Sequence, residues 1–338
     1  MPQADSILRL EDVEVHFPVT DGIFKRVVGH VKAVDGVTLT IRRGEVMGLV
    51  GESGCGKTTL GKAILQLVRP TAGSVIYEGA GREAPVDLRG LSNADLTPYR
   101  KRLQIVFQDP HSSLNPAFTI FGSLEDPLKL YGVRTRAERR KIVGDLLEAV
   151  NMRPEAMDKY PHEFSGGQRQ RIGIARALSI EPELIVCDEA VSALDVSIQA
   201  QVLELLMKLK REKNLTYIFI THDLSVTEYL CDRIAVMYLG RIVELCDAAE
   251  LYENTLHPYT EALLSAIPVA DLDKKTRRIV LEGDVPSPVN PPSGCPFHPR
   301  CRKAQAVCKT DVPALRRFQT AGGEHYAACH LIDLPEAE

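Results

Sequence analysis

The chain has 338 residues, and 41 Lys and Arg residues against 45 Asp and Glu give a formal net charge of −4. This balance excludes the basic surplus expected of a general nucleic-acid binder, and the length predicts about two domains with a large buried core. The longest apolar runs fall far short of the roughly 18 to 20 residues that span a bilayer, and residues 1–5 lack the features of a signal peptide. We therefore expect a soluble protein that reaches a membrane only through partners.

An apolar run at residues 46–50 is typical of a buried strand, and it leads into the sequence GESGCGKTT at Gly51–Thr59. A helix is expected to begin near Leu60. A strand, a glycine-rich loop and a helix, in that order, are the context that a phosphate-binding loop requires. The alternative is a glycine-rich turn that binds nothing, and the complete GxxxxGK[ST] pattern disfavours it.

Each residue type in this loop has a chemical reason to bind a nucleotide. Glycines let the backbone turn its N–H groups toward an anion at a helix N-terminus. Lys57 is expected to contact the β- and γ-phosphates and to act in catalysis, Thr58 to bind Mg²⁺, and Thr59 to reach the α-phosphate. The predicted nucleotide-binding set in the loop is Gly51, Ser53, Gly54, Cys55, Gly56, Lys57, Thr58 and Thr59.

A strand-like run at residues 103–107 ends at Gln108, which opens a proline-rich loop over residues 109–116. A glutamine there can contact Mg²⁺ and report the nucleotide state to a neighbouring subunit. Farther along, Ile142, Val143, Leu146, Leu147 and Val150 recur at helical spacing. The stretch between Gln108 and Ser165 is therefore predicted to be mostly helical.

The segment Phe164–Gln168 (FSGGQ), followed by the basic run Arg169-Gln170-Arg171, is by itself a short polar segment that opens a helix. Its position is informative, because it lies after the phosphate-binding loop and about twenty residues before two acidic residues. Those acids, Asp188 and Glu189, follow the apolar run 184–187, which is typical of a central parallel strand. Asp188 is predicted to hold Mg²⁺ through water and Glu189 to polarise the attacking water. Alternatively, the two acids only cap the next helix.

A third predicted strand, residues 217–220, ends at Thr221-His222. We interpret His222 as the residue that senses the γ-phosphate and orients the water, against the alternative of an ordinary surface histidine. Periodicity also predicts an amphipathic helix over residues 198–209 and a hairpin over residues 234–243.

After about residue 255 prolines become dense, which disfavours regular helices and central strands. We expect something other than a hydrophobic core to hold this region. Four of the eight cysteines, Cys295, Cys301, Cys308 and Cys329, lie here with the spacing C-x5-C-x6-C-x20-C. Disulfides are disfavoured in a reducing compartment. The spacing leaves a zinc site, with His298, His325 or His330 as substitute ligands, and an iron-sulfur cluster about equally favoured.

The motifs together resemble the nucleotide-binding subunit of ABC transporters over roughly residues 7–250. They correspond to Walker A (51–58), the Q-loop (Gln108), the signature (164–168), Walker B (184–189), the D-loop (192–195) and the H-loop (His222). The signature begins with Phe164, where leucine is commoner in that family. The resemblance implies an α/β fold: a P-loop NTPase core of ABC type with an antiparallel β subdomain and an inserted helical subdomain at about 109–165. It implies a nucleotide-binding domain at 1–255 and a loop-rich, metal-binding C-terminal extension at 256–338.

The same resemblance implies that two ATPase subunits pack head to tail. Ser165, Gly166, Gly167 and Gln168 then close over ATP held by the partner subunit. An aromatic residue is expected to stack on adenine. Phe17 is the candidate, but an insertion at about 18–31 separates it from the next strand, and Phe24 is the alternative.

The segments HPYT, LLSAIP and GCPFHPRC make residues 256–338 similar to the C-terminal extension of oligopeptide and dipeptide importer ATPases. In that family four such cysteines are associated with a [4Fe-4S] cluster, with Zn²⁺ as the alternative here.

Residues 22–26 resemble the F-type member of a two-ATPase pair. The expected cofactors are ATP, Mg²⁺ and the cluster. The expected partners are a second, non-identical ATPase, two permease subunits and an extracytoplasmic solute-binding protein, at the cytoplasmic face of the inner membrane. An importer of nickel or another small solute is the alternative.

Overall fold

The computed structural model describes residues 6–22, 24–79, 84–109, 113–267, 278–320 and 322–336. Residues 1–5 and parts of three other segments discussed above lie outside the described residues: Ile23 in the insertion, residues 110–112 in the proline-rich loop and Pro268 in LLSAIP. The chain divides into two compact units. The first unit comprises residues 1–90 and 221–338, and the second unit comprises residues 91–220.

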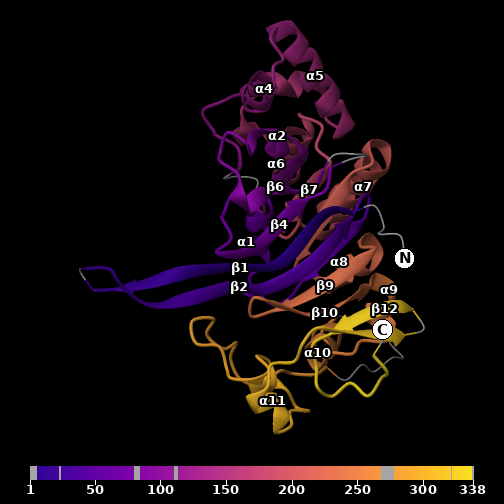
Figure 1. Cartoon of the computed structure of the whole chain (residues 1–338). Coiled ribbons are helices and arrows are strands. Elements are labelled where there is room, and N and C mark those ends of the chain that lie inside the picture. The colour runs from indigo at the N-terminus through magenta and orange to yellow at the C-terminus, as the bar shows by residue number, and fades with distance from the viewer. Residues whose placement is uncertain are drawn as a thin grey trace, which may run out of the picture. The chain divides into compact units, whose positions relative to one another are not determined.

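The first unit contains two sets of paired strands (Figure 1). Its elements are β1 (Ser6–Asp21), β2 (Arg26–Arg42), β3 (Val46–Val50), α1 (Lys57–Ile64), β4 (Ala72–Tyr77), β5 (Val86–Asp87), η1 (Leu88–Gly90), α8 (Leu224–Leu230), β9 (Arg233–Tyr238), β10 (Arg241–Asp247), α9 (Ala248–Glu253), α10 (Pro258–Leu264), η4 (His298–Arg300), α11 (Val307–Thr310), β11 (Arg316–Thr320) and β12 (Gly323–Ala327). An antiparallel sheet has the order β2-β1-β4-β5. In the other set, β9 pairs in parallel with β3 and antiparallel with β10, and β12 lies between β10 and β11. The predicted antiparallel β part and the predicted hairpin at residues 234–243 are thus confirmed.

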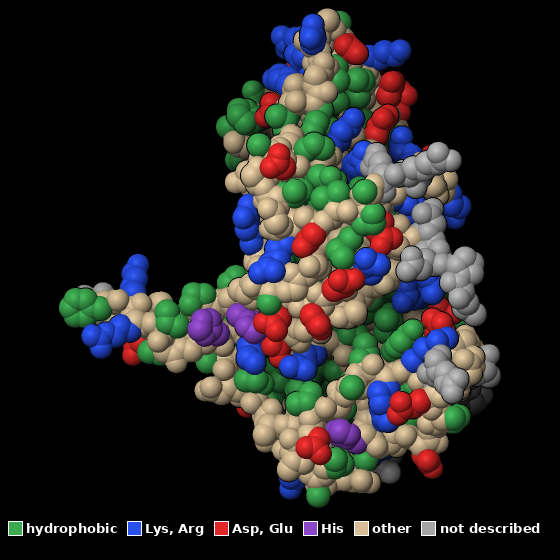
Figure 2. Space-filling view, in the orientation of Figure 1, with side chains coloured by type: hydrophobic (Ala, Val, Ile, Leu, Met, Phe, Trp, Pro, Cys, Tyr) green, Lys and Arg blue, Asp and Glu red, His purple; other side chains and the backbone are tan. Residues whose placement is uncertain are grey.

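The segment predicted to be an insertion after Phe17 continues the hairpin of β1 and β2. Phe17 pairs with Val31, and the pairing runs on to Asp21 and Arg26. The expectation that an insertion separates Phe17 from the next strand is therefore wrong, because the extra residues lengthen both strands. Figure 2 shows this arm, with hydrophobic and basic side chains toward its end, where the Phe24 side chain is 85% exposed.

The second unit contains a parallel sheet and a group of helices. Its elements are α2 (Thr97–Arg102), β6 (Leu103–Val106), α4 (Ile120–Leu130), α5 (Arg136–Ala149), η2 (Pro154–Asp158), η3 (Pro161–Glu163), α6 (Gly166–Leu178), β7 (Leu184–Asp188), α7 (Val196–Lys213) and β8 (Thr216–Thr221), whose last residue belongs to the first unit. β7 pairs in parallel with β6 and with β8. All five residues of β7 are buried, as expected of an apolar strand covered on both faces.

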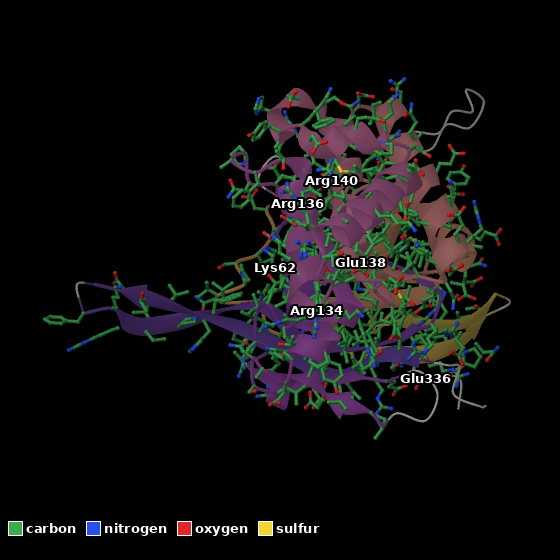
Figure 3. All side chains as sticks on the ribbon, turned by 90° about the horizontal axis from the view of Figure 1, so that it is seen from above. Lys62, Arg134, Arg136, Glu138, Arg140 and Glu336 are labelled. Carbon is green, nitrogen blue, oxygen red and sulfur yellow. The ribbon has the colours of Figure 1, made fainter. Side chains whose placement is uncertain are left out.

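The helices α4 and α5 lie in the stretch predicted to be helical. Thr119 and Thr135 cap them, since each hydroxyl accepts a backbone N–H of the first turn. Arg136 and Arg140 of α5, labelled in Figure 3, are four residues apart, and both guanidinium groups lie over the Phe121 ring at 5.7 and 5.2 Å. The predicted apolar face over residues 142–150 is confirmed at four of its five positions, since Val143, Leu146, Leu147 and Val150 are buried and Ile142 is only partly buried. The boundaries predicted for the domains stay a prediction.

The C-terminal extension shares a buried aromatic core with β9, so the expectation that no hydrophobic core holds it is wrong. The rings of Tyr238, Tyr259 and Phe297 are almost fully buried, and their centroids lie 4.7 to 5.3 Å apart. Aromatic side chains bury a large area each, so a few of them can hold a segment that is too rich in proline for regular structure. Beyond that segment, β12 extends the β9-β10 hairpin, an arrangement the proline pattern did not predict.

A buried carboxylate also anchors the extension. Glu244 of β10 accepts hydrogen bonds from Leu256 N at 2.6 Å and His257 N at 3.2 Å, and it lies 2.8 Å from Nε2 of His325. Glu244 and His325 are both fully buried. Burial also lowers the pKa of the neighbouring His257 to about 4, which keeps that ring neutral at pH 7. In the part of the chain that the structure describes, no helix has the length and apolar character to cross a membrane.

Candidate functional site

The loop Gly51–Gly56 between β3 and α1 has the backbone of a phosphate-binding loop. Gly51, Gly54 and Gly56 have φ values of 149°, 82° and 107°. A Cβ atom at Gly51 would overlap the carbonyl oxygen of Met237, and one at Gly56 would overlap that of Ala33. Glycine is therefore required at both positions by conformation and by close approach. Gly56 is also the N-cap of α1, so no capping side chain competes for the amides of the first turn.

Lys57 lies over this loop and is buried. Its Nζ donates to the carbonyl oxygens of Gly51 at 2.8 Å and Glu52 at 2.9 Å, and Cys55 Sγ lies 3.6 Å away. Burial raises the pKa of the Cys55 thiol, so this residue is an uncharged filler of the loop. The two carbonyls hold the ammonium group at the helix N-terminus, where it can add positive charge to the backbone amides.

Glu52 of the loop makes contacts that the motif analysis did not predict. Its N–H donates to the hydroxyl of Tyr259 at 2.9 Å, and its carboxylate accepts two hydrogen bonds from Arg300 at 2.6 and 3.0 Å. Tyr259 and Arg300 follow Glu52 by 207 and 248 residues. No local pattern signals such contacts. The phosphate-binding loop and the C-terminal extension are thus directly connected within the first unit.

In the second unit, Gln108 and Glu189 are brought together. Gln108 Nε2 donates to Glu189 Oε2 at 2.8 Å. Glu189 follows buried Asp188 at the end of β7 and has a φ of 45°, an uncommon value for a residue with a side chain. Its N–H donates to Ile220 O at 3.0 Å. Uncommon backbone conformations held by tertiary contacts often occur at functional sites, and the catalytic role of Glu189 stays a prediction.

The signature residues form the start of α6. Ser165 Oγ accepts the N–H of Gln168, and Gln168 Oε1 accepts the N–H of Ser165 at 3.0 Å, which is a reciprocal capping box. A Cβ atom at Gly167 would overlap the side chain of Ile198 in α7. Ser165, Gln168 and Gly167 therefore have local structural roles, which the sequence analysis did not assign to them.

The remaining predicted residues, His222, Phe17 and Phe24, belong to the first unit. His222 is exposed at the end of β8, just before Asp223 caps α8 through its contact with Ser225 N. Phe17 of β1 is 40% exposed, and Phe24 is near the far end of the same hairpin. The first unit contains the phosphate-binding loop, Phe17, His222 and the four extension cysteines. The second contains Gln108, Ser165–Gln168, Asp188 and Glu189.

The four cysteines Cys295, Cys301, Cys308 and Cys329 are free thiols, and all but Cys301 are buried. Burial, with smaller contributions from the other three sulfur atoms, raises the pKa of Cys295 to about 11. Cys295 N donates to Cys308 O at 2.9 Å. Leu331 N donates to Cys329 Sγ at 3.4 Å, and backbone groups two residues later also hydrogen-bond to Cys295 and Cys301. Among the described residues, however, no group of three or more His, Cys, Asp or Glu is placed to hold a metal ion.

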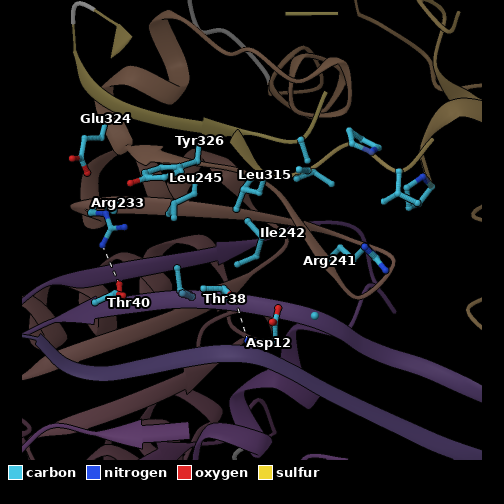
Figure 4. Close-up of a pocket in the computed structure, with 18 of the residues that line it drawn as sticks. Asp12, Thr38, Thr40, Arg233, Arg241, Ile242, Leu245, Leu315, Glu324 and Tyr326 are labelled. Carbon is cyan, nitrogen blue, oxygen red and sulfur yellow. Dashed lines mark hydrogen bonds between the residues drawn. The ribbon is translucent and has the colours of Figure 1, made fainter. Parts of the chain in front are cut away.

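The first unit also has a cavity of about 760 Å³ between the β1-β2 pair and the β10-β12 pair. Figure 4 shows Thr38 and Thr40 on one side and Leu245 and Tyr326 on the other. Arg233, on its wall, donates to Thr40 O at 3.1 Å. Of the described residues that line this cavity, none belongs to the predicted nucleotide-binding set.

Comparisons with known proteins match both parts of the chain. Residues 34–192 match the ABC transporter family, and residues 243–308 match the oligopeptide/dipeptide transporter C-terminal region. The chain is 51% identical to the oligopeptide transport ATP-binding protein AppF of Bacillus subtilis (strain 168), over 97% of this chain and 98% of AppF. It is 50% identical to the probable peptide ABC transporter ATP-binding protein y4tS of Sinorhizobium fredii, over 97% and 90% of the two chains.

Among solved structures, the chain resembles the dimeric ATP-binding cassette MJ0796 bound to ADP and Pi. The TM-score is 0.62 at 29% identity, over 72% of this chain and 99% of that one. CbiO1 of Clostridium perfringens, part of a cbiONQ complex, gives 0.61 at 27% identity, over 74% and 92%. The fold is thus that of an ABC ATPase cassette. The chain belongs to the ABC transporter family, in the group of oligopeptide and dipeptide transport ATP-binding proteins that carry this C-terminal region.

Proposed function

We propose that this chain binds and hydrolyses ATP to energise an importer of oligopeptides or dipeptides. The single observation that carries the proposal is the match to peptide-transport ATP-binding proteins along almost the whole chain, including the extension. The glycine backbone of the loop and the Gln108–Glu189 contact give this match a chemical basis.

In the phosphate-binding half of the site, backbone amides of Gly51–Gly56 and the α1 N-terminus cradle the phosphates. Lys57 adds a charge to the β- and γ-phosphates, and Thr59 reaches the α-phosphate. The oxygen donors of Thr58, Asp188 and Gln108 are of the type that Mg²⁺ prefers. When bound, Mg²⁺ neutralises the charge that develops on the phosphates.

In the hydrolytic half, Glu189 accepts a proton from the attacking water and Gln108 holds the carboxylate in place. The water oxygen forms a bond to the γ-phosphorus as the bond to the ADP oxygen breaks, and His222 orients the water and the γ-phosphate. Glu189→Gln is expected to keep ATP binding and to abolish turnover. Hydrolysis near the wild-type rate by an assembly whose only intact site carries that change would refute the role of Glu189.

The partner arrangement is also part of the proposal. The amides at Ser165–Gly167 and the Gln168 side chain cover ATP held by a second, non-identical ATPase, this chain being the F-type member. The pair binds two permease subunits at the cytoplasmic face of the inner membrane, and an extracytoplasmic binding protein delivers the solute. Co-expression with candidate partners tests this, because a purified complex that contains two copies of this chain and no other ATPase contradicts it.

Phe17 is proposed to stack on adenine, with Phe24 as the alternative. The position of Phe17 on β1, within the first unit that holds the loop, favours it over Phe24 near the end of the arm. Phe17→Ala is therefore expected to weaken ATP binding more than Phe24→Ala does. A larger loss in Phe24→Ala reverses the assignment.

We also propose that the four extension cysteines hold a [4Fe-4S] cluster. The sequence similarity of the extension supports this proposal, and so do the backbone hydrogen bonds to Cys295, Cys301 and Cys329, which lower the pKa of these thiols and so favour the thiolate that a metal binds. Anaerobically purified protein should contain iron and sulfide, and Cys301→Ala should lose them while the buried Cys246→Ala keeps them. Purified protein that contains zinc and no iron would instead identify the cysteines as a zinc site.

Only the names of the relatives indicate that the transported solute is a peptide. The second candidate function is an importer of nickel or another small solute. Measuring which ligand of the binding protein stimulates ATP hydrolysis by the reconstituted transporter separates the two. Stimulation by peptides and not by nickel is the expected result.

A further inference from the structure

Glu52 is held at three points inside the phosphate-binding loop. Its side chain binds Arg300 in a bidentate ion pair, its N–H binds the Tyr259 hydroxyl, and its carbonyl oxygen accepts from Lys57 Nζ. One residue thereby links two groups of the extension to the lysine that contacts the phosphates. Tyr259 restrains the Glu52 main chain directly, and Arg300 restrains the same residue through its side chain, so the two contacts together fix the carbonyl that positions Lys57.

Arg300 is well placed to act as a fixed anchor. It ends the 3₁₀ turn η4, its N–H donates to Phe297 O at 3.0 Å, and its side chain is only 7% exposed. The Glu52 carboxylate raises its pKa, so the guanidinium is charged at every working pH. A planar guanidinium with two parallel hydrogen bonds fixes both the position and the orientation of a carboxylate.

Tyr259 is anchored in the same region. It is fully buried in α10, and its ring packs against those of Tyr238 and Phe297. Burial raises the pKa of its hydroxyl, which therefore stays protonated and can accept the Glu52 N–H. The loop carries both contacts on one residue, whereas the extension supplies them from two segments about forty residues apart.

We infer that Arg300 and Tyr259 are positioning residues of the ATP site, through which the C-terminal extension sets the geometry of the phosphate-binding loop. The inference rests on the proposed function, because it assigns these residues a role in ATP binding. The extension is then part of the nucleotide site and not only an appended segment.

The test compares Mg-ATP affinity in variants of the full chain. Removing a hydrogen bond to a charged group typically costs about tenfold in an equilibrium constant, so Arg300→Ala should raise the Kd for Mg-ATP by about that factor. Arg302→Ala is the matched control. Arg302 lies two residues later, is 54% exposed and binds Val280 O and Glu282 instead of the loop, so its Kd should remain within twofold of wild type.

A double-mutant cycle separates positioning from general stability. If Arg300 acts through Glu52, Arg300→Ala combined with Glu52→Gln should bind Mg-ATP no more weakly than Arg300→Ala alone. Tyr259→Phe removes one hydroxyl and keeps the ring, so it serves if Arg300→Ala does not fold, and it should weaken binding several-fold at an unchanged melting temperature. Unchanged affinity in both Arg300→Ala and Tyr259→Phe, or additive effects in the cycle, overturns the inference.

The two proposals fail in different ways. If wild-type protein does not bind Mg-ATP, the proposed function fails before any variant is compared. If wild-type protein binds it, Lys57→Ala abolishes binding and Arg300→Ala matches Arg302→Ala, only the positioning role fails.

Discussion

The phosphate-binding loop and the cysteine-bearing loop at residues 294–308 both lie in the first unit, but they are held in different ways. The first follows a buried strand, and its shape comes from glycines with positive φ at Gly51, Gly54 and Gly56. The second is rich in proline and depends on side chains far away in sequence, such as Tyr238 and Tyr259. Local backbone chemistry thus specifies one loop, and tertiary packing specifies the other.

The largest effect is expected from a substitution that prevents the backbone conformation of the phosphate-binding loop. Gly56→Ala places a Cβ against the Ala33 carbonyl at a φ of 107°, so the loop cannot keep its conformation. Mg-ATP binding should be lost at concentrations that saturate wild type, as measured by equilibrium binding. Gly54→Ala is the control. Gly54 also has a positive φ, but an added Cβ atom there would contact nothing, so this variant should lose only part of its affinity for Mg-ATP. Equal affinity in the two variants contradicts the steric argument.

The next effect concerns the anchor of the extension. Glu244→Ala leaves His325 and the Leu256 and His257 N–H groups without their buried acceptor. Breaking such a buried network costs about 3 to 5 kcal/mol, which urea denaturation can measure. Glu253→Ala, on the exposed side of α9, should change the free energy of unfolding by less than about 0.5 kcal/mol. A similarly small change in Glu244→Ala would show that the network does not hold the extension.

Acid should weaken the extension through His257. Its pKa is about 4 in the folded chain, below the ordinary 6.5, because burial disfavours the charged ring. Between these values the unfolded chain binds the proton and the folded chain does not, so stability is lost as the pH falls from 6.5 to 4. The loss approaches about 3 kcal/mol. His257→Asn can keep the α10 cap without titrating, and its unfolding free energy should depend less steeply on pH over that range. An equal pH dependence excludes His257 as the source.

The smallest effect is expected from Phe297. Phe297→Leu keeps an apolar side chain but removes the ring contacts with Tyr238 and Tyr259, at a cost of about 1 kcal/mol in the free energy of unfolding. Calorimetry should show a slightly lower melting temperature and unchanged affinity for Mg-ATP. A large loss of affinity would mean that the ring positions Arg300, which would extend the role of the packing to the loop.

Much of the site was predictable because its chemistry is local. The apolar strands before Gly51, Gln108 and Glu189 are marked by short runs of residues, and Ser165 and Gln168 are three residues apart in a capping box. The core of the extension was not predictable, since prolines signal only what a segment cannot form. The continuation of β1 and β2 beyond Phe17 was missed for a related reason, because an exposed hairpin has no buried face and so needs no regular alternation of apolar and polar residues.

By itself, the sequence determined the phosphate-binding loop, the acidic strand end and the class of ATPase. These features depend on dihedral preferences and on the order of residue types within about ten positions. Only the tertiary structure decided that Arg300 and Tyr259 hold Glu52, and that Glu244 is enclosed with His325. Such contacts join residues far apart in the chain, and they form only when folding brings these residues together, because polar groups that lose water on burial need hydrogen-bond partners within the protein.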